Sequence, residues 1–120
     1  MNTNRPTLPI STPVPELPVQ DVKRAQQHYH DVWGFEIGWL QPSEEIGSVH
    51  NEKAVLFLRK RALPFEPAVH WVFAQHIEAA YRDLQASGAK IVALLELKPW
   101  GLRQFTVEDL DGNRFYFHCD

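Results

Sequence analysis

The stretch PWGLRQFTVEDLDGNRFYFH, residues 99–118, decides how this chain folds. Two runs rich in aromatic and β-branched residues flank the segment DLDGN, residues 109–113. Glycine and asparagine tolerate the positive φ of a tight turn, so the stretch predicts a β-hairpin. Strand alternation gives the second run an apolar face and a polar face, Phe115 and Phe117 against Arg114, Tyr116 and His118. We therefore expect one packed face and one face that presents polar side-chain tips.

Length and composition exclude several classes of protein. A chain of 120 residues has room for one domain with a single core. The formal net charge is -3, and the basic run at residues 59–61 is short, so no nucleic-acid partner is expected. No apolar block is long enough for a membrane span or a signal segment. Cys119 is the only cysteine, so no intrachain disulfide can form, and a cytoplasmic location is expected.

The beginning of the chain is rich in proline. Residues 1–18 contain five of the nine prolines, which disfavour a free helix. We therefore predict that residues 1–12 form a flexible or exchanged N-terminal arm and that residues 14–19 are extended.

The first half of the chain reads as one helix and several strands. Asp21 is a typical N-cap, apolar residues follow at helical spacing, and Gly34 ends the helix. Runs of β-branched and aromatic residues predict strands at 35–40, 46–50 and 54–59. The segments between these runs are predicted to be a turn at 41–45 and a tight connection at 51–53.

The second half repeats this order after a linker at residues 60–68. It predicts a strand at 69–74, a helix at 76–86 ended by Gly88, a strand at 91–95 and then the hairpin. Aligning Asp21 with His76 sets the two halves 55 residues apart. We interpret this as an internal duplication of a βαβββ module within one α+β domain, with modules at 13–59 and 69–118. Such modules curl their strands into a half-open sheet with a cleft.

Several short motifs match one family. They are PVP at 13–15, VQDV at 19–22, HY at 28–29, GF at 34–35, WVF at 71–73, AY at 80–81, PWGLRQF at 99–105 and EDLDGN at 108–113. With these motifs the chain resembles the vicinal oxygen chelate superfamily, and within it the bleomycin resistance proteins most. The resemblance implies a homodimer with an exchanged N-terminal arm. It also implies grooves at the dimer interface that hold a flat, cationic antibiotic between aromatic rings without breaking it.

The resemblance also locates the metal positions of the superfamily's enzymes, which use His, Gln or Glu. Carried over by register, these positions are Val14, Phe57, Val69 and Tyr116. None of these side chains is a ligand for Zn²⁺, Fe²⁺ or Mn²⁺. We therefore expect no metal, no other cofactor and no catalytic residue.

Two other sequence patterns resemble parts of metal sites. A register shift of one residue would replace Val69 by His70, and Glu16 and His118 could then complete a loose cluster. The segment 109–113 alternates oxygen-bearing side chains like the start of a calcium loop, but it lacks that loop's later glycine and glutamate, so a β-turn explains it better.

The chain is unusually rich in tryptophan, with four in 120 residues. Rings on facing walls can clamp a planar ligand, and a tryptophan face attracts a cation. The expected ligand-binding residues are Trp39, Phe57, Trp71, Phe73, Trp100, Arg103 and Tyr116. Negative charge at the rim would come from Glu16 or from Glu44 and Glu45. Ile46 stands where the resistance proteins have an aromatic residue, which leaves the identity of the ligand open.

These observations lead to one function and two alternatives. The first hypothesis is a metal-free, homodimeric protein that sequesters a planar, cationic, antibiotic-like molecule and so confers antibiotic resistance. The alternative is a metal-dependent glyoxalase or dioxygenase-type enzyme of the same superfamily. A third possibility is a chain with a vestigial cleft that serves in dimerisation or protein contact.

Overall fold

The computed structural model describes residues 4–52 and 54–120 of the chain. Residues 1–3 of the expected arm and residue 53 of the expected connection at 51–53 lie outside this description. The elements in chain order are β1 (Glu16–Val19), α1 (Val22–Trp33), β2 (Glu36–Leu40), β3 (Ile46–Asn51), β4 (Ala54–Lys60), β5 (Val69–Phe73), α2 (Ile77–Ala86), β6 (Lys90–Leu97), β7 (Arg103–Glu108) and β8 (Arg114–Cys119).

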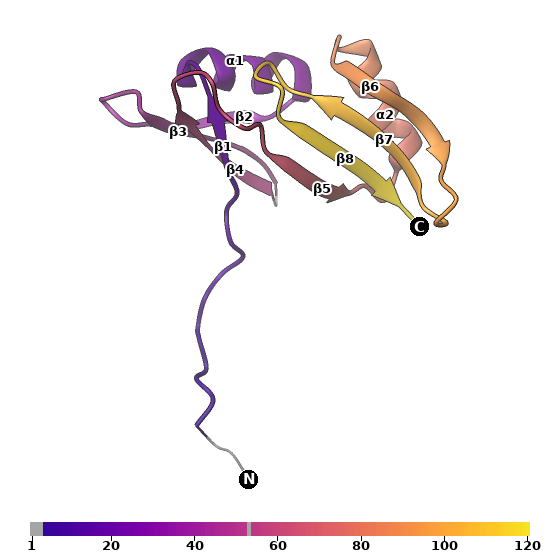
Figure 1. Cartoon of the computed structure of the whole chain (residues 1–120), viewed down its shortest axis with the longest axis horizontal. Helices are drawn as coiled ribbons and strands as arrows, with labels where there is room; N and C mark the ends of the chain where they lie inside the picture. The colour runs from indigo at the N-terminus through magenta and orange to yellow at the C-terminus, as the bar shows by residue number, and fades with distance from the viewer. Residues whose placement is uncertain (1–3, 53) are drawn as a thin grey trace.

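The strands form two sheets of the same topology (Figure 1). Sheet A has the order β1-β4-β3-β2, and sheet B has the order β5-β8-β7-β6. The β1–β4 pair of sheet A and the β5–β8 pair of sheet B are parallel. All other neighbouring strands are antiparallel. The predicted α+β fold of two βαβββ modules is confirmed. No helix in the described part of the chain is long and apolar enough to span a membrane.

Local signals placed the first helix correctly. The Asp21 side chain accepts a hydrogen bond from the backbone N–H of Arg24 at 3.0 Å, and Gly34 ends α1 with φ 72°. Val22, Ala25 and Tyr29 are among the buried residues of α1, and Ile77 and Leu84 are the buried residues of α2. Each helix packs against its own sheet, so one face of each sheet stays open.

Several strand boundaries differ from those expected. β1 begins at Glu16 rather than at residue 14, and β4 continues to Lys60. β6 is longer than residues 91–95, and β7 begins only at Arg103 because residues 98–102 form a turn. In that turn Gly101 has φ 92°, which glycine adopts without strain.

The two modules share one buried core. The indole of Trp33, at the end of α1, packs edge-on against Phe115 of sheet B, with 4.8 Å between ring centroids. The Asn113 side chain spans the joint, since its Nδ2 donates to the carbonyl of Pro18 at 2.9 Å and its Oδ1 accepts from the N–H of Ala68 at 2.8 Å. The N-terminal arm, by contrast, runs away from the folded body (Figure 1), and residues 4–14 are exposed.

Candidate ligand-binding site

The open face of sheet B carries a row of large exposed apolar side chains. On β5, Val69, Trp71 and Phe73 are 52–58% exposed, whereas His70 and Val72 alternate with them and are less exposed. The His70 ring lies 5.7 Å from that of Phe115, on the core side of the strand. Solvent-exposed aromatic rings in a row are typical of a binding surface.

The neighbouring strand completes an aromatic cluster. Trp71 faces Tyr116 across the parallel β5–β8 pair, and their ring centroids are 4.8 Å apart with an interplanar angle of 36°. His118 faces Phe73 in the same register, and its ring lies 5.8 Å from Phe73 and 5.7 Å from Trp71. We call Trp71, Phe73, Tyr116 and His118 the sheet B ring cluster.

Two polar atoms beside this cluster have no hydrogen-bond partner within the described residues. They are Nδ1 of His118 and Oε1 of Gln104, both buried. Gln104 and His118 face each other across the β7–β8 pair, so both side chains belong to the open face. Unpartnered buried polar atoms are uncommon, and a bound water or ligand is one explanation for them.

The open face of sheet A carries a second, smaller ring pair. Trp39 of β2 packs edge-on against Phe57 of β4, with 5.1 Å between centroids. Beside it, Glu16 binds Nε of Arg59 at 2.8 Å and approaches Arg61 at 3.5 Å. The two arginines therefore neutralise the carboxylate of Glu16.

The remaining expected residues lie elsewhere. Trp100 is 61% exposed in the turn before β7 and has no ring contact with another described residue. Arg103 shares its face of β7 with Phe105, whose ring is edge-on to Tyr81 of α2, and it forms an ion pair with Glu78 of α2. The structure thus brings Arg103 to neither open face, because strand alternation turns it toward the helix.

A hollow of about 390 Å³ lies where residues 11–15 lead from the exposed arm into β1. Its other walls are residues 54–56 of β4, residues 70–72 of β5 and Phe115. Trp71 therefore borders both the open face of sheet B and this hollow.

The donor set of this site does not fit the metal of the superfamily's enzymes. Val14, Phe57, Val69 and Tyr116 offer aliphatic and aromatic side chains, which are poor ligands for these metals. Within residues 4–52 and 54–120, no three His, Cys, Asp or Glu side chains are grouped so that they could hold a metal ion.

The loose histidine cluster considered from the sequence does not assemble either. Glu16 is engaged by arginines, His70 packs on Phe115, and His118 lies among the rings of β5. Burial lowers the pKa of His70, as expected for an imidazole held in its neutral form against the core. The turn at 109–113 is a β-turn whose Asp109 carboxylate accepts from the backbone N–H groups of Asp111 and Asn113 at 2.8 and 2.9 Å.

Sequence reasoning left two contributors out of the expected ligand-binding set. His118 was assigned to the polar face of its strand, yet the structure places its ring between Trp71 and Phe73. Gln104 carried no signal of its own, because the register of β7 against β8 was needed to place it beside His118.

Comparison with known proteins identifies the family. The model for the Glyoxalase/Bleomycin resistance protein/Dioxygenase superfamily matches residues 13–117. The chain belongs to this superfamily. No curated protein sequence matched the chain.

Solved structures share the fold at low sequence identity. TioX from Micromonospora sp. ML1 is 26% identical, with a TM-score of 0.75 over 90% of this chain and 98% of TioX. A bleomycin-binding protein complexed with bleomycin is 17% identical, with a TM-score of 0.78 over 92% of this chain and 99% of its own. Lactoylglutathione lyase from Agrobacterium tumefaciens is 19% identical, with a TM-score of 0.69 over 92% and 95% of the two chains. Binding proteins and enzymes of the superfamily thus share this architecture.

Proposed function

We propose that this protein binds and sequesters a planar, cationic, antibiotic-like molecule in an aromatic cleft at the interface of a homodimer, and that this binding confers antibiotic resistance in the cytoplasm. The observation that carries the proposal is the sheet B ring cluster. Trp71 and Phe73 are more than half exposed on β5, the edge strand of sheet B that pairs with β8. A folded chain leaves such rings uncovered where a ligand or a partner binds.

The chemistry of the two open faces supports this class of ligand. Trp71 and Tyr116 present π faces on which a planar ring can stack, each contact contributing about 0.5–1.5 kcal/mol. The indoles of Trp71 and Trp39 also attract a cation. Because Arg59 and Arg61 neutralise Glu16, we assign the negative rim charge to Glu44 and Glu45, which are exposed in the turn after β2.

A homodimer explains why the rings occur in two groups. In one chain, the described residues show no ring contact between the pair Trp39 and Phe57 and the sheet B ring cluster. A second copy could bring sheet A of one chain opposite sheet B of the other, so that the two groups form facing walls. The exposed arm, with Leu8 and Ile10 67% and 73% exposed, is available to fasten such a pair.

Tryptophan fluorescence tests the proposal. We expect bleomycin to quench the emission saturably at one molecule per protomer, because tryptophans line both walls. Metal analysis after purification without chelator provides the contrast with the enzyme alternative. Absence of saturable quenching across a panel of bleomycin-type compounds would contradict the proposed ligand, and stoichiometric metal that is required for a catalytic activity would favour the enzyme.

A further inference from the structure

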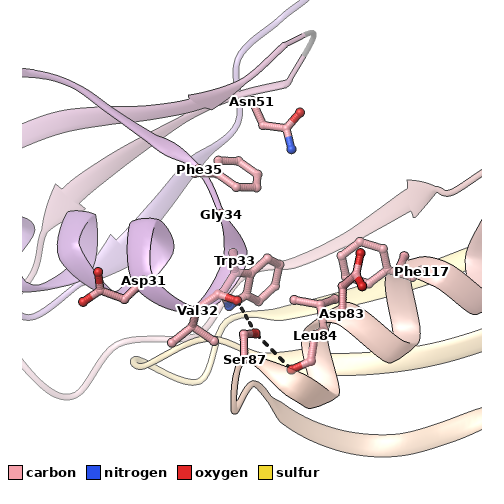
Figure 2. Close-up of a pocket in the computed structure, with 11 residues that line it drawn as sticks. Asp31, Val32, Trp33, Gly34, Phe35, Asn51, Asp83, Leu84, Ser87 and Phe117 are labelled. Atoms are coloured by element: carbon pink, nitrogen blue, oxygen red, sulfur yellow. Dashed lines mark hydrogen bonds between the residues drawn. The ribbon is translucent and has the colours of Figure 1, made fainter.

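A hollow of about 450 Å³ lies between the two modules, at the ends of the helices (Figure 2). Its walls come from the end of α1, the connection at residues 34–35, the end of β3, α2 with the residue that follows it, and β8. Pockets for small organic ligands have volumes of roughly 300–1,000 Å³. None of the residues named above on the two open faces lines this hollow.

Aromatic rings line more than one side of this inter-module hollow. The rings of Trp33 and Phe35 are 6.5 Å apart, and those of Trp33 and Phe117 are 5.9 Å apart. Figure 2 shows Phe35 and Trp33 on one side of the hollow and Phe117 on the other. Ring faces attract a cation within about 6 Å of the ring centroid.

The charge of the hollow has a single sign. Asp31 and Asp83 are the only charged residues that line it in the described part of the chain. Asp31 accepts a hydrogen bond from Nε2 of Gln27 at 2.9 Å, whereas the carboxylate of Asp83 has no hydrogen bond or ion pair within the described residues. A ligand seated on the rings would therefore meet the carboxylate of Asp83 first.

The floor of the hollow joins the two modules. The hydroxyl of Ser87 donates a hydrogen bond to the carbonyl of Val32 at 2.5 Å and also approaches the carbonyl of Leu84 at 3.1 Å. The nearby indole Nε1 of Trp33 is buried and has no partner within the described residues. A buried donor without a partner is uncommon in a packed core, and a water that enters the hollow can accept from it, whereas an ammonium group offers it no acceptor.

We infer that this inter-module hollow is a second binding site, and that it takes a small organic cation with a compact aromatic body and a primary ammonium group. The aromatic body packs on Trp33, Phe35 and Phe117, and the ammonium group binds Asp83. This inference does not depend on the proposed function, because the two sites share no side chain.

The test uses the full chain and 2-phenylethylammonium as the probe, followed by ¹H–¹⁵N NMR of the indole N–H groups. The Trp33→Phe variant assigns the Trp33 signal among the four indoles. Two compounds with the same phenyl ring and two-carbon spacer, 2-phenylethanol and 3-phenylpropionate, replace the ammonium group by a neutral hydroxyl or an anionic carboxylate. We expect the cation to shift the Trp33 signal saturably and to bind about two to five times more tightly than the alcohol, as for a partly exposed ion pair.

Variants separate the carboxylate from the rings. Asp83→Asn should reduce the affinity for the cation to that for the alcohol, and Asp83→Glu should restore it. Glu66→Gln, which removes an exposed charge in the linker, should change nothing. The inference is overturned if the Trp33 signal does not move, if 3-phenylpropionate binds as tightly as the cation, or if Asp83→Asn has no larger effect than Glu66→Gln.

Discussion

The hydroxyl of Tyr29 in the first module donates a 2.6 Å hydrogen bond to Oδ2 of Asp109 in the second. Both residues are buried, since Tyr29 is 0% and Asp109 only 4% exposed to solvent. Burial is the largest of the effects that raise the pKa of Tyr29 well above its ordinary value, so the phenol remains a donor at neutral pH. This bond connects α1 to the turn of the hairpin that identifies the family, and so it helps to fix how the two sheets are placed.

Replacing Tyr29 with Phe should therefore lower the free energy of unfolding by about 1–3 kcal/mol, because a buried carboxylate loses a donor. Denaturant unfolding measures the loss. Tyr81→Phe is the matched control, since its ring packs edge-on against Phe105 but its hydroxyl has no hydrogen-bond partner in the described part of the chain. Equal losses in the two variants would show that the hydrogen bond contributes nothing specific.

Stability should fall as the pH drops below 6.5. Burial lowers the pKa of both His70 and His28 from 6.5, so the unfolded chain binds more protons than the folded chain between that value and the lower folded pKa values. Below pH 6.5 the free energy of unfolding therefore decreases until the folded imidazoles are themselves protonated. His70→Gln should reduce the slope of this part of the pH profile and leave the share of His28, as measured by thermal unfolding from pH 7.5 to 5. A variant that keeps the full slope would contradict the assignment to His70.

The exposed arm should strengthen self-association. Sedimentation of the full chain is expected to show a dimer at micromolar concentrations, and deletion of residues 1–12 is expected to weaken dimerisation about ten-fold, equivalent to about 1.4 kcal/mol. The deletion should not unfold the chain, because residues 4–14 are exposed and the backbone contact of β1 with β4 begins at Pro15. A full-length chain that is monomeric at these concentrations would contradict the dimeric cleft.

Arg103 provides a test of the side-chain placement. Arg103→Gln removes the ion pair with Glu78 on the helix side of sheet B, so a stability loss below about 1 kcal/mol is expected, as for an exposed pair. Ligand affinity should change little, because Arg103 lies on neither open face. A large loss of affinity with unchanged stability would instead place the guanidinium at the ligand.

Local patterns predicted the elements of this fold well. The Asp21 cap and Gly34 defined α1, and alternation in the hairpin separated Phe115 from Tyr116, because these signals depend on backbone geometry within a few residues. Long-range register is different. Whether Gln104 faces His118 depends on the register that the turn at residues 109–113 sets between β7 and β8, and whether Arg103 meets Glu78 depends on how α2 packs on sheet B.

The grouping of the rings also required the structure. Trp71 and Tyr116 are 45 positions apart in the sequence, yet their rings are in contact because β5 and β8 pair in parallel. The inter-module hollow carried no sequence signal at all, since its walls come from two modules whose contact is made by Trp33 and Ser87.

Calorimetric titration of bleomycin into the full chain, compared with the Trp71→Ala variant, tests the central claim most directly. Calorimetry is preferred for this variant because Trp71 is itself a fluorescent reporter. We predict saturable binding at one molecule per protomer and a loss of about two- to ten-fold in affinity for Trp71→Ala, the equivalent of one stacking contact. Leu110→Ala, which truncates an exposed side chain in the β7–β8 turn, should bind like the unmodified chain. Absence of saturable heat, or equal affinity of the Trp71→Ala variant and the unmodified chain, would contradict an aromatic binding site on sheet B.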